Sequence, residues 1–250
     1  MTKYGVQVYL YTRYFFQVML DNLGVLLYTI VLPLFFLVLN IHQALFKPLT
    51  MTQVVWHIMP FIAWMIFSNF LVAVSDIAML REQGYLKQYA TLVVNPTVFI
   101  VSKFLVSVAV LLVTLTLMGI GCSVLFQLPL WGLVWRLWVV LLLTSGPIMG
   151  YCLPLLSFAI RFKTLNAVVN VVTLVVMIGS AAIENQFQFA VNTIWLNLIS
   201  PMYLVMNVFN GLLNGHLVAA LPAYLVTLVV MFAIGMVSYR HCQLLPVEGI

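Results

Sequence analysis

Charged side chains are scarce in this sequence. Of its 250 residues, 6% are Asp, Glu, Lys or Arg, whereas soluble domains carry about 25%. Hydrophobic residues make up 65% of the chain, and its mean hydropathy is +1.17. This composition excludes a soluble globular domain, a disordered chain and a nucleic-acid-binding protein. Since one membrane crossing takes about 20 apolar residues, the length predicts about six or seven crossings in an all-α integral membrane protein.

Cysteine, histidine and the common catalytic motifs are also sparse. The three cysteines are far apart and the four histidines are scattered, so neither a disulfide framework nor a metal site is expected. No Walker A, H-E-x-x-H or G-x-S-x-G motif occurs. The apolar runs hold almost none of the ionisable residues that a proton- or ion-coupled carrier usually needs. We therefore expect no catalytic residue and no bound cofactor in this chain, and an enzyme is disfavoured.

Six apolar runs are interpreted as transmembrane helices of a single domain spanning 1–250. They cover residues 24–39, 54–74, 98–126, 133–158, 165–183 and 217–237. Prolines interrupt the first and fourth runs, which membrane helices tolerate where neighbours satisfy the freed carbonyl. With six crossings, the Lys and Arg residues divide eight to two between the two sides. This bias places both termini, residues 76–95 and residues 160–164 in the cytoplasm.

Residues 1–22 differ from the six runs in their polar pattern. On a helix at 100° per residue, the polar side chains fall within an arc of about 120°, and the remaining surface is aromatic or aliphatic. The polar residues are Lys3, Gln7, Arg13, Gln17 and Asp21. This pattern favours an amphipathic helix in the membrane interface over the alternative, a long first transmembrane helix with a frayed start.

Residues 184–215 do not read as a simple loop, because apolar residues are mixed with six asparagines. Ser200 and Pro201 break the segment in the middle, and Tyr203 follows the break. Two short helices around a proline suit a re-entrant or interfacial hairpin before the last helix. The Lys and Arg bias places this hairpin on the outer side.

The charged stretch between the second and third runs has two interpretations. From Asp76 to Tyr89 it holds four charged residues and two tyrosines. It is compatible with a short helix along the membrane that presents these side chains to a cytoplasmic partner. A solvated loop that only anchors the topology accounts for the same residues equally well.

The same stretch resembles the hallmark of ABC-2-type transporter permeases. Residues 80–89, LREQGYLKQY, contain the cytoplasmic R-E-x-G-x-L pattern of that family. Asn95-Pro96 and Ser102-Lys103 follow where the family has a proline and then a Gly-Lys pair, with serine in place of the glycine. Residues 199–203, ISPMY, look like a second family element before the last helix. The order of elbow helix, six spans, coupling loop and outer hairpin is also similar to the family.

This resemblance implies the permease subunit of an ATP-driven exporter in a plasma membrane, of bacterial type. A second copy or a related permease would pair with it, and two separate ATPase subunits would bring ATP and magnesium. Arg161 and Lys163 would either form a second, weaker contact with the ATPase or only anchor the topology as positive residues on the cytoplasmic side. In the family, the loop after the second span docks on the ATPase. Carried over here, the docking residues are Arg81, Glu82, Gln83, Gly84, Tyr85, Leu86 and Lys87.

The cargo is constrained only by what the spans contain. No segment between them is long enough for a large outer domain. Candidate residues of a translocation path are mildly polar: Ser68, Asn69, Asn166 and Asn170. Such a path suits a hydrophobic or amphipathic cargo, namely a drug, an antimicrobial peptide (a bacteriocin) or a lipid-linked molecule. The alternatives are an ATP-independent carrier and a membrane protein for immunity or sensing.

Overall fold

The computed structural model describes residues 3–20, 23–41, 45–85, 93, 95, 97–158, 161–187, 190–215 and 217–241. Within these residues the regular structure is helical, and no strand occurs. The helices are α1 (Lys3–Leu20), α2 (Leu23–Asn40), α3 (Met51–His57), α4 (Met59–Glu82), α6 (Thr97–Phe126), α7 (Leu130–Cys152), α8 (Pro154–Ser157), α9 (Phe162–Phe187), α10 (Ile194–Ile199), α11 (Pro201–Asn214) and α12 (Leu217–Arg240).

Within the described residues, five segments are long and apolar enough to cross a membrane. They are α4, α6, α7 together with α8, α9 up to Ile183, and α12 from Val218. Helix α2 has 18 residues, which at 1.5 Å per residue gives about 27 Å against a hydrocarbon core of about 30 Å. The molecule is thus a helical, multi-pass membrane protein, and the sixth crossing by α2 stays a prediction.

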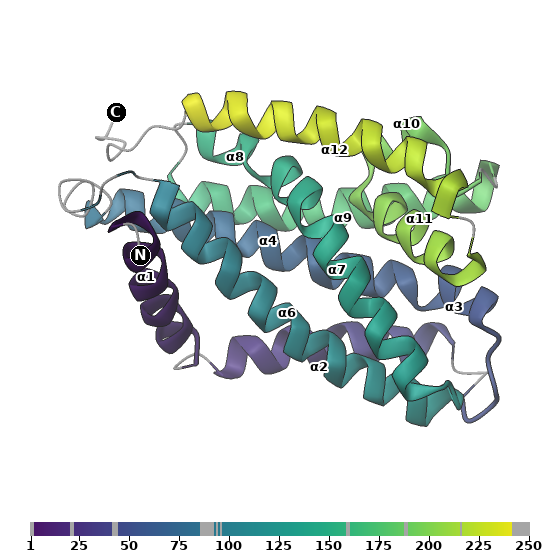
Figure 1. Ribbon diagram of the computed structural model, residues 1–250. Coiled ribbons are helices and arrows are strands. Elements are labelled where there is room, and N and C mark those ends of the chain that lie inside the picture. The colour runs from purple at the N-terminus through teal and green to yellow at the C-terminus, as the bar shows by residue number, and fades with distance from the viewer. Residues whose placement is uncertain are drawn as a thin grey trace.

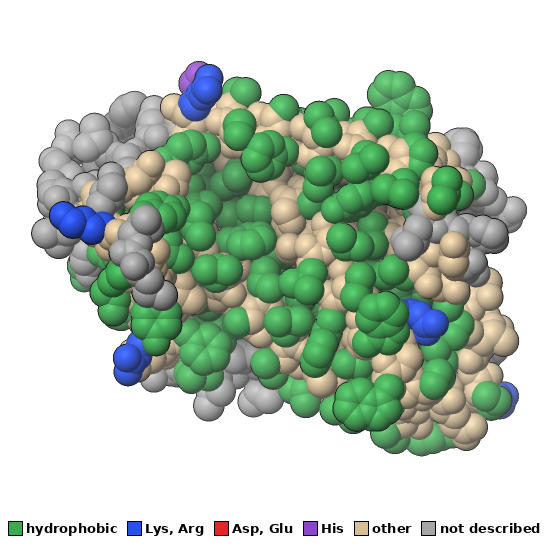
Figure 2. All heavy atoms as spheres, in the orientation of Figure 1, with side chains coloured by type: hydrophobic (Ala, Val, Ile, Leu, Met, Phe, Trp, Pro, Cys, Tyr) green, Lys and Arg blue, Asp and Glu red, His purple; other side chains and the backbone are tan. Residues whose placement is uncertain are grey.

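The long helices share one general direction, and α1 runs across them (Figure 1). One end of the bundle holds α1, the last residue of α4 and of α12, and the first residue of α6 and of α9. We call it the terminal end. The opposite end holds α3, α10 and α11, and we call it the hairpin end. Figure 2 shows apolar side chains over most of one face, with Lys and Arg near these two ends.

Helix α4 lies at the centre of the bundle and α9 at its periphery. Of the most apolar stretch of each, 72% is buried inside the molecule in α4 and 11% in α9. Helix α4 contacts α2, α3, α6, α7, α8, α9 and α11. The sequence predicts a loop from residue 76, whereas α4 continues to Glu82. Lys103 Nζ lies 2.8 Å from Asp76 Oδ2, so this partly exposed carboxylate has a cationic partner on α6 and the helix need not end there.

The predicted break at Ser200-Pro201 coincides with the junction of α10 and α11. Ser200 is extended (φ −121°, ψ 118°), and its Oγ accepts a hydrogen bond from the Met202 N–H at 3.2 Å. Proline at the first helical position and serine before it are typical of a helix start. Helix α11 is enclosed by α3, α4, α7 and α12. That this pair of helices is re-entrant and lies on the outer side stays a prediction.

Helix α7 and the short α8 that follows it contact α12 at three pairs of positions seven residues apart. The pairs are 143 with 224, 150 with 231, and 157 with 238. In the middle pair, a Cβ on Gly150 would lie 2.5 Å from the carbonyl oxygen of Met231. Only a glycine allows this approach of the two backbones, as is common where membrane helices pack closely.

Pro147, inside α7, leaves the carbonyl of Leu143 without its helical donor, because proline has no N–H. The hydroxyl of Tyr224 on α12 donates to this carbonyl at 3.0 Å. A neighbouring helix thus satisfies the group that the proline frees, as is required in a bilayer. The bond also joins α7 to α12 far from the terminal end, since Tyr224 lies about 24 Å along the helix from Arg240 at 1.5 Å per residue.

This arrangement predicts a dependence between two substitutions. Tyr224→Phe should lower the free energy of unfolding by about 1 kcal/mol, a usual value for a hydrogen bond between membrane helices. In the Pro147→Ala background the same change should cost almost nothing, because the restored N–H at 147 bonds the Leu143 carbonyl. Thermal melting of the four proteins measures the coupling. An equal cost of Tyr224→Phe in both backgrounds would refute the proposed partnership.

Candidate functional site

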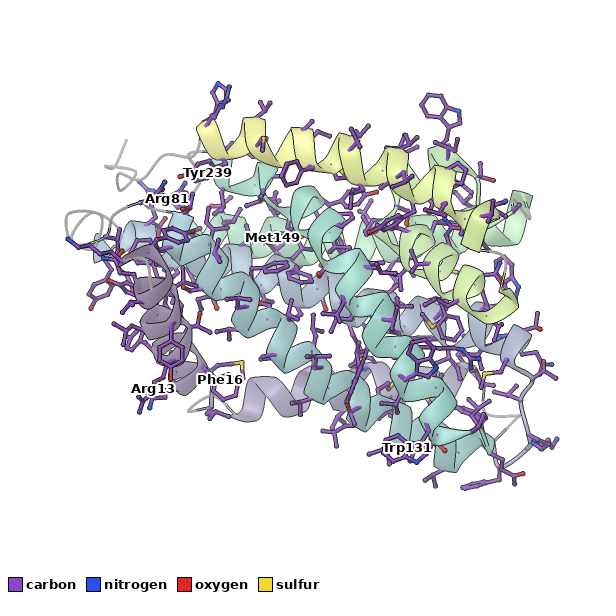
Figure 3. The ribbon with its side chains drawn as sticks, in the orientation of Figure 1. Arg13, Phe16, Arg81, Trp131, Met149 and Tyr239 are labelled. Atoms are coloured by element: carbon purple, nitrogen blue, oxygen red, sulfur yellow. The ribbon has the colours of Figure 1, made fainter. Side chains whose placement is uncertain are left out.

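A group of polar contacts at the terminal end lies where α4 meets the connection from α8 to α9. Arg81 is only 1% exposed, although it is charged (Figure 3). Its Nη1 donates to the carbonyls of Leu156 at 3.1 Å and Phe158 at 3.4 Å, and its Nη2 to that of Phe158 at 3.4 Å. These carbonyls are at the C-terminal end of α8, where the backbone dipoles favour a cation.

Glu82, the next residue, makes the complementary contact. Its Oε1 accepts a hydrogen bond from the backbone N–H of Phe162, the first residue of α9. Helix N-termini carry unsatisfied N–H groups and partial positive charge, so a carboxylate is favoured there. Two adjacent residues of opposite charge at the end of α4 therefore bind the C-terminal end of α8 and the N-terminal end of α9. We call Arg81, Glu82 and their three backbone partners the corner clamp.

Immediately after Glu82, the chain leaves α4 in an exposed turn. Gln83 and Tyr85 are exposed, and Gly84 between them has φ +75°. A left-handed conformation of this kind favours glycine. The N–H of Gly84 donates to the Arg81 carbonyl at 3.1 Å, and that of Gln83 to the Met79 carbonyl at 3.0 Å. The turn is thus attached directly to the last residues of α4.

The structure sorts the predicted docking residues into two groups. Arg81 and Glu82 face into the molecule, and their interpretation as direct contacts of an ATPase stays a prediction that their present partners do not favour. Gln83 and Tyr85 are accessible, with Gly84 between them. The remaining two predicted residues, 86 and 87, lie outside the described residues.

The second predicted contact lies at the same corner. Arg161 directly precedes α9, and Lys163 is the second residue of that helix. Both side chains are exposed. They flank Phe162, the clamp residue at the start of α9, whereas the turn at 83–85 follows Glu82, the clamp residue at the end of α4. The clamp therefore brings the two predicted cytoplasmic contacts, which are about eighty residues apart in sequence, to one end of the molecule.

The candidate path residues lie on two helices that touch, α4 and α9. Ser68 is half-buried, and its hydroxyl donates to the Met65 carbonyl of its own helix at 3.2 Å. Asn69 is also half-buried, whereas Asn166 and Asn170 lie on the exposed surface of α9. The two asparagines of α9 thus face away from the bundle centre, toward lipid or a further chain. Whether the four residues line a path stays a prediction.

At the hairpin end a second polar cluster joins α10 and α11 to the spans. Ser200 and Ser180 share a hydrogen bond between their hydroxyls at 2.6 Å, and the Tyr151 hydroxyl donates to the Asn197 carbonyl. Ser200, Pro201 and Tyr203, the predicted hairpin residues, are all buried. Tyr151 and Asn197 were not predicted, and no sequence signal marks them, since one acts through a main-chain carbonyl.

Among the residues that the structure describes, no group of three His, Cys, Asp or Glu side chains could hold a metal ion. Cys122 and Cys152 are buried and unbonded to each other. No protein-family model and no curated protein matches this chain in sequence.

Proposed function

We propose that the chain is the transmembrane permease subunit of an ATP-binding cassette exporter. It would pair with a second permease and take its energy from two separate ATPase subunits, which hold ATP and magnesium. Both termini and the terminal end would face the cytoplasm of a cell whose plasma membrane the chain crosses six times. The cargo would be hydrophobic or amphipathic: a drug, an antimicrobial peptide or a lipid-linked molecule.

The observation that supports this proposal is the corner clamp beneath an exposed turn. A partner that pushes on Gln83 or Tyr85 acts on the end of α4. Arg81 and Glu82 pass that displacement to the end of α8 and the start of α9. Two spans then move together, as a transporter driven from outside the membrane requires. A ligand or partner shifts such an equilibrium only if it prefers one of the two arrangements.

The resemblance of residues 80–89 and 199–203 to ABC-2 permeases supports the same function. In the proposed topology, α1 is the interfacial elbow, residues 83–95 form the coupling loop, and α10 and α11 form the outer re-entrant hairpin. An ATP-independent carrier would instead need a coupling group within its spans. In the described part of the chain, Asp76 and Lys103 are an acid and a base within the spans. They pair with each other near the terminal end, and this arrangement does not favour a coupling role for either of them.

A pull-down of the tagged chain from native membranes tests the proposal, with mass spectrometry and an ATPase assay on the eluate. We expect an ATP-binding subunit to co-purify. Tyr85→Ala should reduce its recovery about tenfold or more, because truncating a central aromatic of an interface often costs about 2 kcal/mol or more. Tyr14→Ala, at an exposed tyrosine of α1, is the matched control. An ATPase-free protein would move the carrier and sensor alternatives forward, and equal recovery from both variants would exclude the turn as the contact.

A further inference from the structure

Helix α1 is fixed to the bundle by one face only. Phe15 is buried on that face, and the Ser102 hydroxyl of α6 donates to the Val8 carbonyl at 3.1 Å. Lys103 Nζ lies 4.7 Å from the centre of the Phe15 ring, while it pairs with Asp76 of α4. An ammonium over a ring and beside a carboxylate is a strongly oriented contact. The rotation of α1 about its own axis is therefore set, and so are the directions of its other faces.

A second face of α1 is apolar and exposed. Tyr9, Phe16 and Leu20 are separated by seven and four residues, so on a helix they fall within about 40° of one another. All three are exposed, whereas Phe15 is buried. In Figure 3 the labelled Phe16 lies on the side of α1 toward α2, inward from the terminal end. An apolar strip in this position is suited to the acyl boundary of a membrane.

The third face, next to the apolar strip, carries the two cations of α1. Lys3, Arg13 and Gln17 are exposed and fall within an arc of about 80° on the helix, in which Val6 and Leu10 are exposed as well. Helix α1 contains no Asp or Glu among its 18 residues. Arg13 points away from the bundle in Figure 3, and basic side chains mark this edge of the molecule in Figure 2. Each charge is thus free of a competing carboxylate on its own helix.

From these three faces we propose that α1 is a binding surface for anionic phospholipid. Lys3 and Arg13 contact the phosphates of the headgroups, while Tyr9, Phe16 and Leu20 lie at the level of the first acyl carbons. Two cations and no acid on a helix whose exposed residues are otherwise mostly apolar match an anionic lipid surface in both charge and polarity. The opposite face of α1 contacts Lys103 of α6, which pairs with Asp76 of α4. Lipid bound to α1 and this contact between α4 and α6 therefore act on the same helix. This proposal does not depend on the exporter function.

The test is the affinity of the full-length, detergent-solubilised chain for fluorescent phosphatidylglycerol, with phosphatidylcholine as the neutral lipid. We expect the anionic lipid to bind more tightly, and Lys3→Gln with Arg13→Gln to weaken it about 25-fold, at about fivefold per charge. The matched control removes two exposed charges from the same end, by Lys163→Gln with Arg240→Gln. It should change the affinity little. An equal loss in both pairs, or no loss in the first, overturns the proposal.

The apolar strip has its own test in lipid vesicles. A spin label at Phe16→Cys should be more accessible to oxygen, and one at Gln17→Cys more accessible to a water-soluble nickel complex. Cys242 is replaced by alanine for this measurement, since Cys122 and Cys152 are buried. Equal accessibilities at the two sites would show that α1 does not lie at the lipid surface. Neither measurement uses an ATPase, so a failed exporter proposal leaves both results interpretable.

Discussion

Replacing Gly150 with valine is expected to prevent the formation of a stable, monodisperse protein. Even the first carbon of the new side chain would lie 2.5 Å from the Met231 carbonyl oxygen and 2.9 Å from its carbonyl carbon. Backbone atoms of α12 cannot move aside as the end of a flexible side chain can. Overpacking of a core usually costs about 1–3 kcal/mol, and we expect the upper end or more where two backbones must separate. Size-exclusion profiles and thermal melting of the detergent-solubilised protein measure the loss.

Gly146 offers the matched control one helical turn away on the same helix. A Cβ added there would meet no atom within 4 Å, and the residue is exposed. Gly146→Ala, compared with Gly150→Ala, should lower the melting temperature far less, since the gain in helix propensity over glycine offsets part of the cost of a Cβ that precedes Pro147. If the two variants lose stability equally, the effect belongs to α7 itself and the close approach of α7 to α12 is not its cause.

The helical, membrane-spanning class of this protein follows from composition, because a chain that is 65% hydrophobic and 6% charged cannot bury its apolar surface otherwise. Local chemistry also predicts the break at Ser200-Pro201, since proline cannot continue a helix and serine caps the next one. Both signals lie within a few neighbouring residues. They can therefore be recognised without knowing how the helices pack.

The corner clamp carries no such signal. Arg81 and Glu82 bond main-chain groups that lie 75 to 80 residues further along the chain. Any residue type supplies a carbonyl or an N–H, so no partner can be recognised in the sequence. A charge near a membrane boundary is accordingly interpreted as exposed, and residue 76 as the start of a loop. In the structure, Asp76 is paired with Lys103 and Arg81 with carbonyls, so α4 extends through both.

Replacing Arg81 with leucine is expected to open this corner. The buried carbonyl of Leu156 would lose its donor, at a cost of about 1–3 kcal/mol, and the partly buried carbonyl of Phe158 would lose its two contacts at a smaller cost. The stability loss in Arg81→Lys should be smaller than in Arg81→Leu but still measurable. An ammonium keeps the positive charge, but it cannot reproduce the two-pronged contact of a guanidinium. Glu82→Gln keeps an acceptor for the Phe162 N–H and should cost less than about 1 kcal/mol, whereas Glu82→Lys adds a cation at a helix N-terminus and should cost more. Hydrogen exchange of residues 155–165 measures the opening.

The same variants separate binding of a partner from transmission of its motion. If the exposed turn binds the ATPase and the clamp transmits the displacement, Tyr85→Ala loses the ATPase, whereas Arg81→Lys keeps it but loses transport-linked ATP hydrolysis. Lys163→Gln, at an exposed residue beside the clamp, controls for charge and should leave exchange at 155–165 unchanged. Faster exchange with undiminished transport in Arg81→Lys would show that the clamp only stabilises the fold. In that case the displacement of α4 must reach the other spans through its apolar contacts with α6, α9 and α11.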